Sequence, residues 1–305
     1  MRYVVTGAAG FIGSHLMHAL LAAGHDALGI DCFTDYYDPV LKETNASGLD
    51  IVRLDLAEDP LDFAALDGVF HLAGQPGVRS FGDTFPLYLR QNVLASQRVF
   101  DAASRDGVRV VFASSSSIYG DAEVYPTPED IAPAPISPYG ITKLAAEHLA
   151  RAYGHEFGLD AVCLRYFNAY GPFQRPDMAF ARIVSALAEG RPFELYGDGT
   201  QSRGFTYVSD IVDATILAME QASAGAVYNV GGGTEASLLE TIAALERFSG
   251  RRLKLRHRER VDGDVRRTTA DTTRISAELG WRPGVSLDDG LRAEWDWASG
   301  RVGAR

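Results

Sequence analysis

A tyrosine and a lysine four residues apart are the pair in this sequence best suited to proton transfer. Tyr139 and Lys143 share one face of a helix that Pro138 begins, because residues four apart on a helix are neighbours. A free phenol has a pKa of about 10, and a nearby ammonium brings the phenolate into a useful range. The serine run Ser114–Ser117 lies at a predicted strand end, where a hydroxyl would orient a substrate oxygen toward Tyr139.

The chain opens with the pattern of a dinucleotide-binding turn. A short apolar strand leads into the segment Thr6–Gly13, which is followed by a helix and by a second strand ending at Asp31. In such turns the first glycine permits the bend, the second admits a pyrophosphate and the third lets helix and strand pack closely. The three positions are filled by Gly7, Gly10 and Gly13. The helix that follows directs its N-terminal dipole at the anion.

The acid at the end of the second strand selects the cofactor. Asp31 follows the glycines at the distance where a carboxylate meets the adenosine ribose. A carboxylate would repel a 2′-phosphate, and the next basic residue is Lys42, so no nearby arginine is offered for NADP. The sequence therefore predicts NAD, whose positive nicotinamide ring would also favour the phenolate.

Alternating strands and helices predict a doubly wound parallel α/β sheet in the first half of the chain. Beyond Asp31 we expect strands at Ile51–Leu54, Val69–Leu72, Val108–Ser114 and Asp160–Tyr166, with helices near Pro86–Arg105 and Pro138–Phe157. Polar or small residues end several strands, where such sheets bind ligands. Asp55 could bond an adenine amino group or cap its strand, Ala73 and Gly74 allow close approach of a cofactor, and His71 is expected to be packed.

The second half predicts a smaller α/β unit interleaved with the first. Its expected elements are a helix near Phe180–Glu189, a hairpin at Phe193–Thr200, a helix at Val208–Gln221, a strand at Val227–Val230 and two or three further helices up to Arg305. We expect residues 1–167 plus about 204–231 to form the NAD-binding domain, and about 168–203 plus 232–305 the substrate domain.

Composition limits the class of partner. A net charge of −11 argues against nucleic-acid binding but leaves room for an anionic small substrate held by local arginines. Two cysteines, Cys32 and Cys163, are too few for a disulfide framework. The N-terminus leaves no room for a signal peptide, and no apolar run approaches the ~20 residues of a membrane span. We expect a cytoplasmic protein, and we assign no residue to a metal.

Over almost its whole length the chain resembles an extended short-chain dehydrogenase/reductase, specifically the nucleotide-sugar 4-epimerases with a Rossmann sheet. The matching stretches are Thr6–Gly13, Ile30–Tyr37, His71–Gly74, Ser114–Gly120, Ser137–Lys143, Leu164–Pro172, Arg175–Ala179 and Gly197–Val208. The resemblance implies that Tyr139 is the base and Lys143 its partner. It also implies that Ser115 bonds the reacting sugar oxygen.

The resemblance also implies the contacts of each ligand. Cofactor contacts are expected from Gly7, Gly10, Phe11, Ile12, Gly13, Asp31, Cys32, Phe33, Asp55, Leu56, Leu72, Ala73, Gly74, Asn92, Tyr139, Lys143 and Tyr166. Substrate contacts are expected from Ser115, Ser116, Ser117, Tyr139, Asn168, Arg175, Arg203 and Asp264. Asn168 and Arg203 would hold the diphosphate. The family usually has a further arginine two residues before Gly263-Asp264, where this chain has Val261, with Arg260 and Arg266 nearby.

The implied reaction is an isomerisation. Tyr139 takes the proton of the sugar C4 hydroxyl while NAD takes the C4 hydride. The 4-keto sugar turns over about its diphosphate linkage, and the hydride returns to the opposite face. NAD is regenerated and stays bound, and the protein supplies position and proton transfer.

Two features disagree about the sugar. Arg175–Ala179 resembles the epimerases of UDP-glucuronate, in which the arginine lies near the uronate end of the sugar. That group usually has threonine at the position of Asn168, and Arg165–Asn168 resembles the epimerases of neutral UDP-hexoses. The sequence favours UDP-glucose/UDP-galactose, with UDP-glucuronate as the alternative.

Other readings fit the sequence less well. A dehydratase or a decarboxylase of this family would need an acid at Ser115–Ser117, and a silent NAD-binding sensor would commonly lose the Tyr–Lys pair. A simple oxidoreductase would release NADH. By fold analogy, a homodimer is expected through the helices near Pro86–Arg105 and Pro138–Phe157.

Overall fold

A parallel sheet of seven strands forms the body of the protein. The structure is a computed structural model that describes residues 1–77, 82–259 and 267–302. The strand order is β10-β6-β5-β4-β1-β2-β3, and every pairing in this sheet is parallel. The strands are β1 (Arg2–Thr6), β2 (Asp26–Asp31), β3 (Ile51–Arg53), β4 (Gly68–His71), β5 (Val110–Ser115), β6 (Ala161–Tyr166) and β10 (Val227–Val230). The predicted doubly wound fold is confirmed. Its order reverses between β1 and β4, where such sheets bind ligands.

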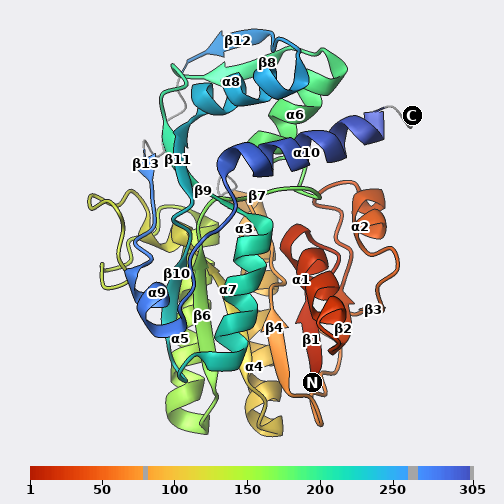
Figure 1. The fold of residues 1–305 in the computed structure, drawn as a ribbon. Coiled ribbons are helices and arrows are strands. Elements are labelled where there is room, and N and C mark those ends of the chain that lie inside the picture. Colours follow the sequence, from red (N-terminus) through yellow and green to blue (C-terminus); the bar gives the residue numbers. More distant parts are fainter. Residues whose placement is uncertain (78–81, 260–266, 303–305) are drawn as a thin grey trace.

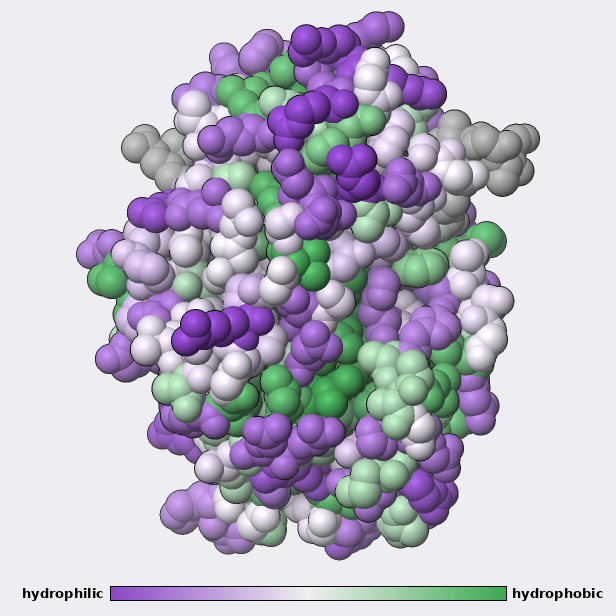
Figure 2. Space-filling model, viewed as in Figure 1, coloured by the Kyte–Doolittle hydropathy of each residue, from purple (hydrophilic) through white to green (hydrophobic). Residues whose placement is uncertain are grey.

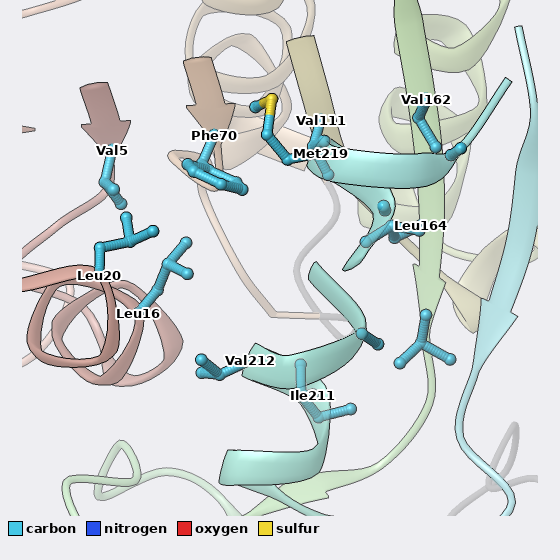
Figure 3. Close-up of a cluster of buried hydrophobic side chains, with 14 of the residues drawn as sticks. Val5, Leu16, Leu20, Phe70, Val111, Val162, Leu164, Ile211, Val212 and Met219 are labelled. Atoms are coloured by element: carbon cyan, nitrogen blue, oxygen red, sulfur yellow. The ribbon is translucent and has the colours of Figure 1, made fainter. Parts of the chain in front are cut away.

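Helices cover both faces of this sheet (Figure 1). Helices α1 (Phe11–Ala22) and α7 (Val208–Gln221) pack on one face, and α4 (Ala95–Asp106) and α5 (Pro138–Phe157) on the other. Figure 3 shows the first of these cores, in which Leu16 and Leu20 of α1 lie close to Val5 and Phe70, and Met219 of α7 lies close to Phe70 and Val111. A strand that is buried on both faces needs apolar side chains at successive positions and not at every second one. This explains the consecutive apolar residues in β4 and at the start of β5.

A second unit lies above the carboxyl end of the sheet, at the top of Figure 1. In it, β9 (Ser202–Tyr207) pairs with β7 (Ala169–Tyr170), β11 (Thr234–Ser237) and β13 (Arg267–Thr268). Helices α6 (Ala179–Glu189), α8 (Leu238–Ser249) and α10 (Leu287–Val302) pack around a core that includes Phe180, Leu187, Leu245 and Leu291.

The predicted hairpin at Phe193–Thr200 is wrong. Only Phe193–Tyr196 forms a strand, β8, and it pairs in parallel with β12 (Leu255–Arg258). The turn residues after β8 instead lead into β9, which belongs to another sheet. Local composition marked a turn correctly, but a parallel partner so distant along the chain leaves no local signal.

The helix expected near Pro86–Arg105 is built from three consecutive segments. These are α3 (Phe85–Tyr88), the π-helical segment η2 (Leu89–Leu94) and α4. Such π segments are frequent at functional sites, and this one carries the buried Asn92. Shorter elements complete the described chain: α2 (Pro39–Asn45), η1 (Gly82–Thr84), η3 (Ser116–Tyr119) and α9 (Thr273–Leu279).

The proposed domain boundaries fall within connected structure. The boundary near residue 204 lies inside β9, and α9 returns to pack against β10 and α7 through Ile275 and Leu279. The two-domain division stays a prediction. The interleaving means that both units contribute walls to the space between them.

Hydrophilic and neutral residues cover most of the face in Figure 2, with hydrophobic atoms in smaller areas between them. In the part of the chain that the structure describes, no helix combines the length and apolarity that crossing a membrane requires. The expected cytoplasmic location and the expected lack of a nucleic-acid partner stay predictions.

Candidate active site

One pocket runs along the carboxyl end of the sheet and receives most of the predicted site residues. Its walls contain Gly7, Gly10, Phe11, Ile12, Gly13, Asp31, Cys32, Leu56, Leu72, Ala73, Gly74, Ser115, Ser116, Ser117, Tyr139, Lys143, Tyr166, Asn168 and Arg175. The residues come from both units, so the fold brings the dinucleotide turn, the Tyr–Lys pair and the arginine of the second unit to one cavity.

The glycine-rich turn is shaped to admit a phosphate. Gly7 has a φ of +72°, and a Cβ there would lie 2.8 Å from the backbone nitrogen of Ala73. A Cβ on Gly13 would lie 2.2 Å from the carbonyl oxygen of Gly7. The helix α1 begins directly after Gly10, and no side chain caps its first turn. Its free N–H groups therefore suit a pyrophosphate, and these residues fit a bound dinucleotide.

Asp31 has a structural task beside its expected ribose contact. Its carboxylate accepts hydrogen bonds from the backbone N–H groups of Ala9 (3.1 Å) and Phe33 (2.8 Å). It thereby ties the glycine turn to the loop that follows β2. Phe33 is held in a left-handed conformation, φ 51°, and it lies outside the pocket lining.

The sequence reasoning missed several lining residues, among them Lys42, Gln75, Pro76, Gln91 and Met178. Lys42 is buried, and its ammonium donates to the hydroxyl of Thr34 at 2.8 Å. In the sequence it is the next basic residue after Asp31, eleven positions on, and α2 brings it to the pocket. Gln75 and Pro76 directly follow the predicted Ala73-Gly74 strand end, so their position in the chain was the available signal.

Asn92 supports the pocket from behind. Its amide donates to the backbone oxygen of Gln75 (3.1 Å) and to the hydroxyl of Thr142 (3.0 Å), and its oxygen accepts from the Gln75 N–H (2.6 Å). It does not line the pocket. His71 is packed as expected: its ring nitrogens contact the hydroxyls of Thr6 and Ser96 at 2.8 and 2.9 Å, and burial lowers its pKa to about 3.

Tyr139 and Lys143 both reach the pocket from the first turns of α5. Ser137 caps this helix by accepting the Gly140 N–H, and Pro138 occupies its first turn. The Lys143 ammonium lies 5.9 Å from the centre of the Tyr139 ring and donates to the carbonyl oxygen of Ala113 at 2.8 Å.

The pKa of the Tyr139 phenol lies above its ordinary value, because burial outweighs the groups that stabilise the phenolate. Burial raises the pKa of Tyr139, while the charge of Arg175 and a hydrogen bond with Ser115 lower it. Burial lowers the pKa of Lys143 to about 8, so its ammonium titrates close to neutral pH. The sequence predicts that the Lys143 ammonium and the nicotinamide ring favour the phenolate. In the structure, the cation that lowers the pKa of the Tyr139 phenol is Arg175, from the second unit.

Arg175 enters the pocket on the loop between β7 and α6. Its guanidinium forms a two-point ion pair with Asp177 and still lines the cavity with Asn168. Asn168 donates to the carbonyl oxygen of Gly204 on β9 at 3.4 Å. The pocket therefore has a cationic group at the end that faces the second unit.

Three other predicted contacts lie apart from the pocket lining or outside the described chain. Asp55 accepts the Ala57 N–H and pairs with Arg90 at 2.8 Å, which matches the strand-capping alternative. Arg203 donates to the backbone oxygen of Ser202 in β9 and does not line the pocket. Asp264 lies outside the described residues, together with Arg260, Val261, Gly263 and Arg266.

Residues 3–231 match the model of the NAD dependent epimerase/dehydratase family. The chain belongs to this family. A curated relative, "Uncharacterized UDP-glucose epimerase YtcB" of Bacillus subtilis, is 40% identical over 96% of each chain. Matching solved structures include UDP-glucuronic acid 4-epimerase of Bacillus cereus with UDP-glucuronic acid and NAD (40% identity, TM-score 0.94, 99% of this chain and 100% of that one).

A further solved relative, MoeE5, has been seen with either of two sugars. The structure of MoeE5 with UDP-glucuronic acid and NAD is 42% identical in sequence to this chain and superposes with a TM-score of 0.89. The match covers 99% of this chain and 100% of MoeE5. A second structure contains MoeE5 with UDP-glucose and NAD. The predicted family, fold, isomerase class and NAD cofactor are confirmed. The protein is an NAD-dependent UDP-sugar 4-epimerase.

Proposed function

We propose that the substrate of this epimerase is UDP-glucuronate, which it interconverts with UDP-galacturonate. The observation that carries the proposal is Arg175, a cation that lines the same pocket as Tyr139. A guanidinium binds a carboxylate through two parallel hydrogen bonds. The structural relative with UDP-glucuronic acid bound adds support. The sequence reasoning favoured a neutral hexose; these observations favour its alternative.

The residues divide the work of the reaction. When bound, NAD supplies a reversible hydride acceptor for the sugar C4. Tyr139 removes the C4 hydroxyl proton and returns it, and Ser115 orients the reacting oxygen. Lys143 and Arg175 contribute positive charge that favours the phenolate. Ser116 and Ser117 line the sugar wall, and Asn168 would hold the diphosphate. Arg203 would join it only by leaving its contact with the Ser202 backbone oxygen.

UDP-glucose is the second candidate. Asn168 stands where the uronate epimerases usually have threonine, and Asp177 already occupies the guanidinium of Arg175. An amide can both donate to and accept from the hydroxyls of a neutral sugar. The MoeE5 complexes with both sugars also support a pocket that tolerates either one.

The decisive experiment is a direct comparison of the two substrates. The purified protein is incubated with UDP-glucuronate or UDP-glucose, with and without added NAD, and the 4-epimers are separated by chromatography. We expect conversion of UDP-glucuronate at a kcat/KM at least about tenfold higher, as loss of one charge-assisted contact implies. Equal or reversed preference would favour the hexose.

We also propose a homodimer formed through the faces of η2 and α5. Leu87 of α3 and Leu94 of η2 are 42% and 45% exposed, and Ile141 of α5 is 42% exposed. Exposed apolar side chains on adjacent helices favour association. Light scattering should give twice the chain mass, and Leu94→Glu should convert the dimer to a monomer. A monomeric parent protein would contradict the proposal.

A further inference from the structure

A third residue on the catalytic face of α5 is buried behind the reacting pair. Glu147 follows Lys143 by four residues, as Lys143 follows Tyr139, so the three share one helix face. Unlike the other two, Glu147 does not line the pocket. Its side chain is only 8% exposed.

Both oxygens of this carboxylate are held by charged or hydroxyl donors. Arg165 of β6 donates from Nε to one oxygen (3.1 Å) and from Nη2 to the other (2.9 Å). Ser114 of β5 donates to Oε1 at 2.5 Å. Arg165 is itself fixed, because its Nη1 donates to the Tyr119 hydroxyl (2.8 Å) and to the Glu129 carbonyl oxygen (3.0 Å).

The same stretch of β5 meets all three residues of the helix face. The Ala113 carbonyl oxygen accepts from Lys143 at 2.8 Å, Ser114 donates to Glu147, and Ser115 hydrogen-bonds Tyr139. The helix is thus registered against the strand at three successive positions. A buried ion pair adds little net stability compared with apolar packing, so stability alone is a weak reason for placing one here.

We propose that Glu147 is a positioning residue for catalysis, which acts through Lys143 by keeping its ammonium charged beside Tyr139 and aimed at Ala113. Arg165 and Ser114 hold the carboxylate in place for this task. The proposal rests on the NAD-dependent 4-epimerisation and is independent of which sugar is converted.

The groups that face Lys143 agree with this role. Burial lowers the pKa of Lys143 to about 8, and the Glu147 carboxylate opposes that fall. His71 of β4 is neutral, and burial raises the pKa of the Cys163 thiol of β6, which keeps it protonated. From η2 the Asn92 amide is uncharged. Among the described residues, Glu147 is therefore the carboxylate that acts on the ammonium.

The test measures the lysine directly as well as the reaction. Glu147→Gln keeps the side-chain volume and removes the charge. Glu147→Gln/Arg165→Met removes both charges, so that no unpaired ion is left buried. For each folded variant, the pH midpoint of Lys143 acetylation by acetic anhydride is followed by peptide mass spectrometry. A full pH profile of kcat is recorded beside it.

We expect the acetylation midpoint to fall by about one pH unit and the alkaline limb of kcat to move down with it. Turnover at pH 8 should fall about fivefold, because the charged fraction of Lys143 falls from about one half to about one tenth, and it should recover in part at lower pH. Arg109→Gln/Asp160→Asn is the control, because it removes another ion pair (2.8 Å), formed by the residues that directly precede β5 and β6 and lie outside the pocket lining. That variant should leave both midpoints unchanged.

A variant that folds, judged by circular dichroism, with both midpoints at the parent value would overturn the proposal. If the double variant does not fold, the acetylation midpoint and the pH profile of kcat of the Glu147→Gln variant test the proposal. The acetylation readout needs neither NAD nor sugar. Its result therefore stands apart from any failure of the substrate assignment.

Discussion

The guanidinium of Arg175 is paired with the carboxylate of Asp177 through two contacts, Nε to Oδ1 at 3.0 Å and Nη2 to Oδ2 at 3.1 Å. The Tyr36 hydroxyl reaches the same carboxylate at 3.4 Å. A sugar carboxylate that binds Arg175 must therefore share its donors with Asp177. If Arg175 binds the sugar as we propose, the preference for uronate over hexose depends on how far this ion pair can open.

Arg175→Ala should lower kcat/KM for UDP-glucuronate far more than for UDP-glucose. A charge-assisted pair contributes about 1.5–3 kcal/mol, so the uronate should lose about 10–100-fold in relative preference. Steady-state kinetics with both sugars measures the ratio. Arg182→Ala, on the exposed side of α6, is the control. An equal loss for both sugars would show that Arg175 serves the base or the fold and not the uronate.

Tyr139→Phe should lower kcat by about 100-fold or more, because the substitution deletes the hydroxyl that accepts the proton. NAD should stay bound, because the aromatic ring is kept. Chromatography of the sugar products measures turnover, and absorbance of the extracted dinucleotide measures binding. Tyr153→Phe, on the same helix but outside the pocket, should retain activity. Substantial turnover by the Tyr139→Phe variant would remove Tyr139 from the mechanism.

Asp31→Ala should weaken NAD more than NADP, because the carboxylate that bonds the ribose hydroxyls also repels a 2′-phosphate. Since Asp31 also accepts the Ala9 and Phe33 N–H groups, some stability should be lost as well. Asp31→Asn keeps an acceptor and separates the two effects. Isothermal titration with both dinucleotides gives the two affinities. Unchanged NAD affinity in both variants would contradict the assignment.

Glu294→Gln should stabilise the protein at neutral pH. Glu294 of α10 is fully buried, and neither carboxyl oxygen has a hydrogen-bond partner among the described residues. Burial raises its pKa well above the usual range, so the folded state keeps the proton. The protein is therefore most stable with respect to Glu294 below about pH 4.3, the pKa of a glutamate in the unfolded chain. This stability is lost as the pH rises toward the higher pKa of Glu294 in the folded state.

The difference between the Glu294→Gln variant and the parent should accordingly grow with pH. We expect a gain of about 1–3 kcal/mol near pH 8, or a few degrees in Tm, and little gain near pH 4. Thermal melts across this range measure it, with the exposed Glu156→Gln as control. A gain that does not change with pH would mean that Glu294 is charged in the folded state.

Much of the sheet could be predicted because its signals are local. The apolar runs of β4 and β5, the caps of α5 and the glycines of the first turn each act within a few residues. Partners far along the chain left no such signal. The turn residues after β8 predict a hairpin, but β8 pairs in parallel with β12. Spacing along the chain also does not show that α2 places Lys42 at the pocket.

The candidate site divides in the same way. The sequence alone determined the dinucleotide turn, the Tyr139–Lys143 pair and the serine strand end, because residue type and spacing along one helix or strand fix which groups meet. Only the tertiary structure decided that Arg175 acts on the phenol of Tyr139, that Asp55 pairs with Arg90 and that Glu147 stands behind Lys143. Charges act across space, and the distances between them are set by how the elements pack.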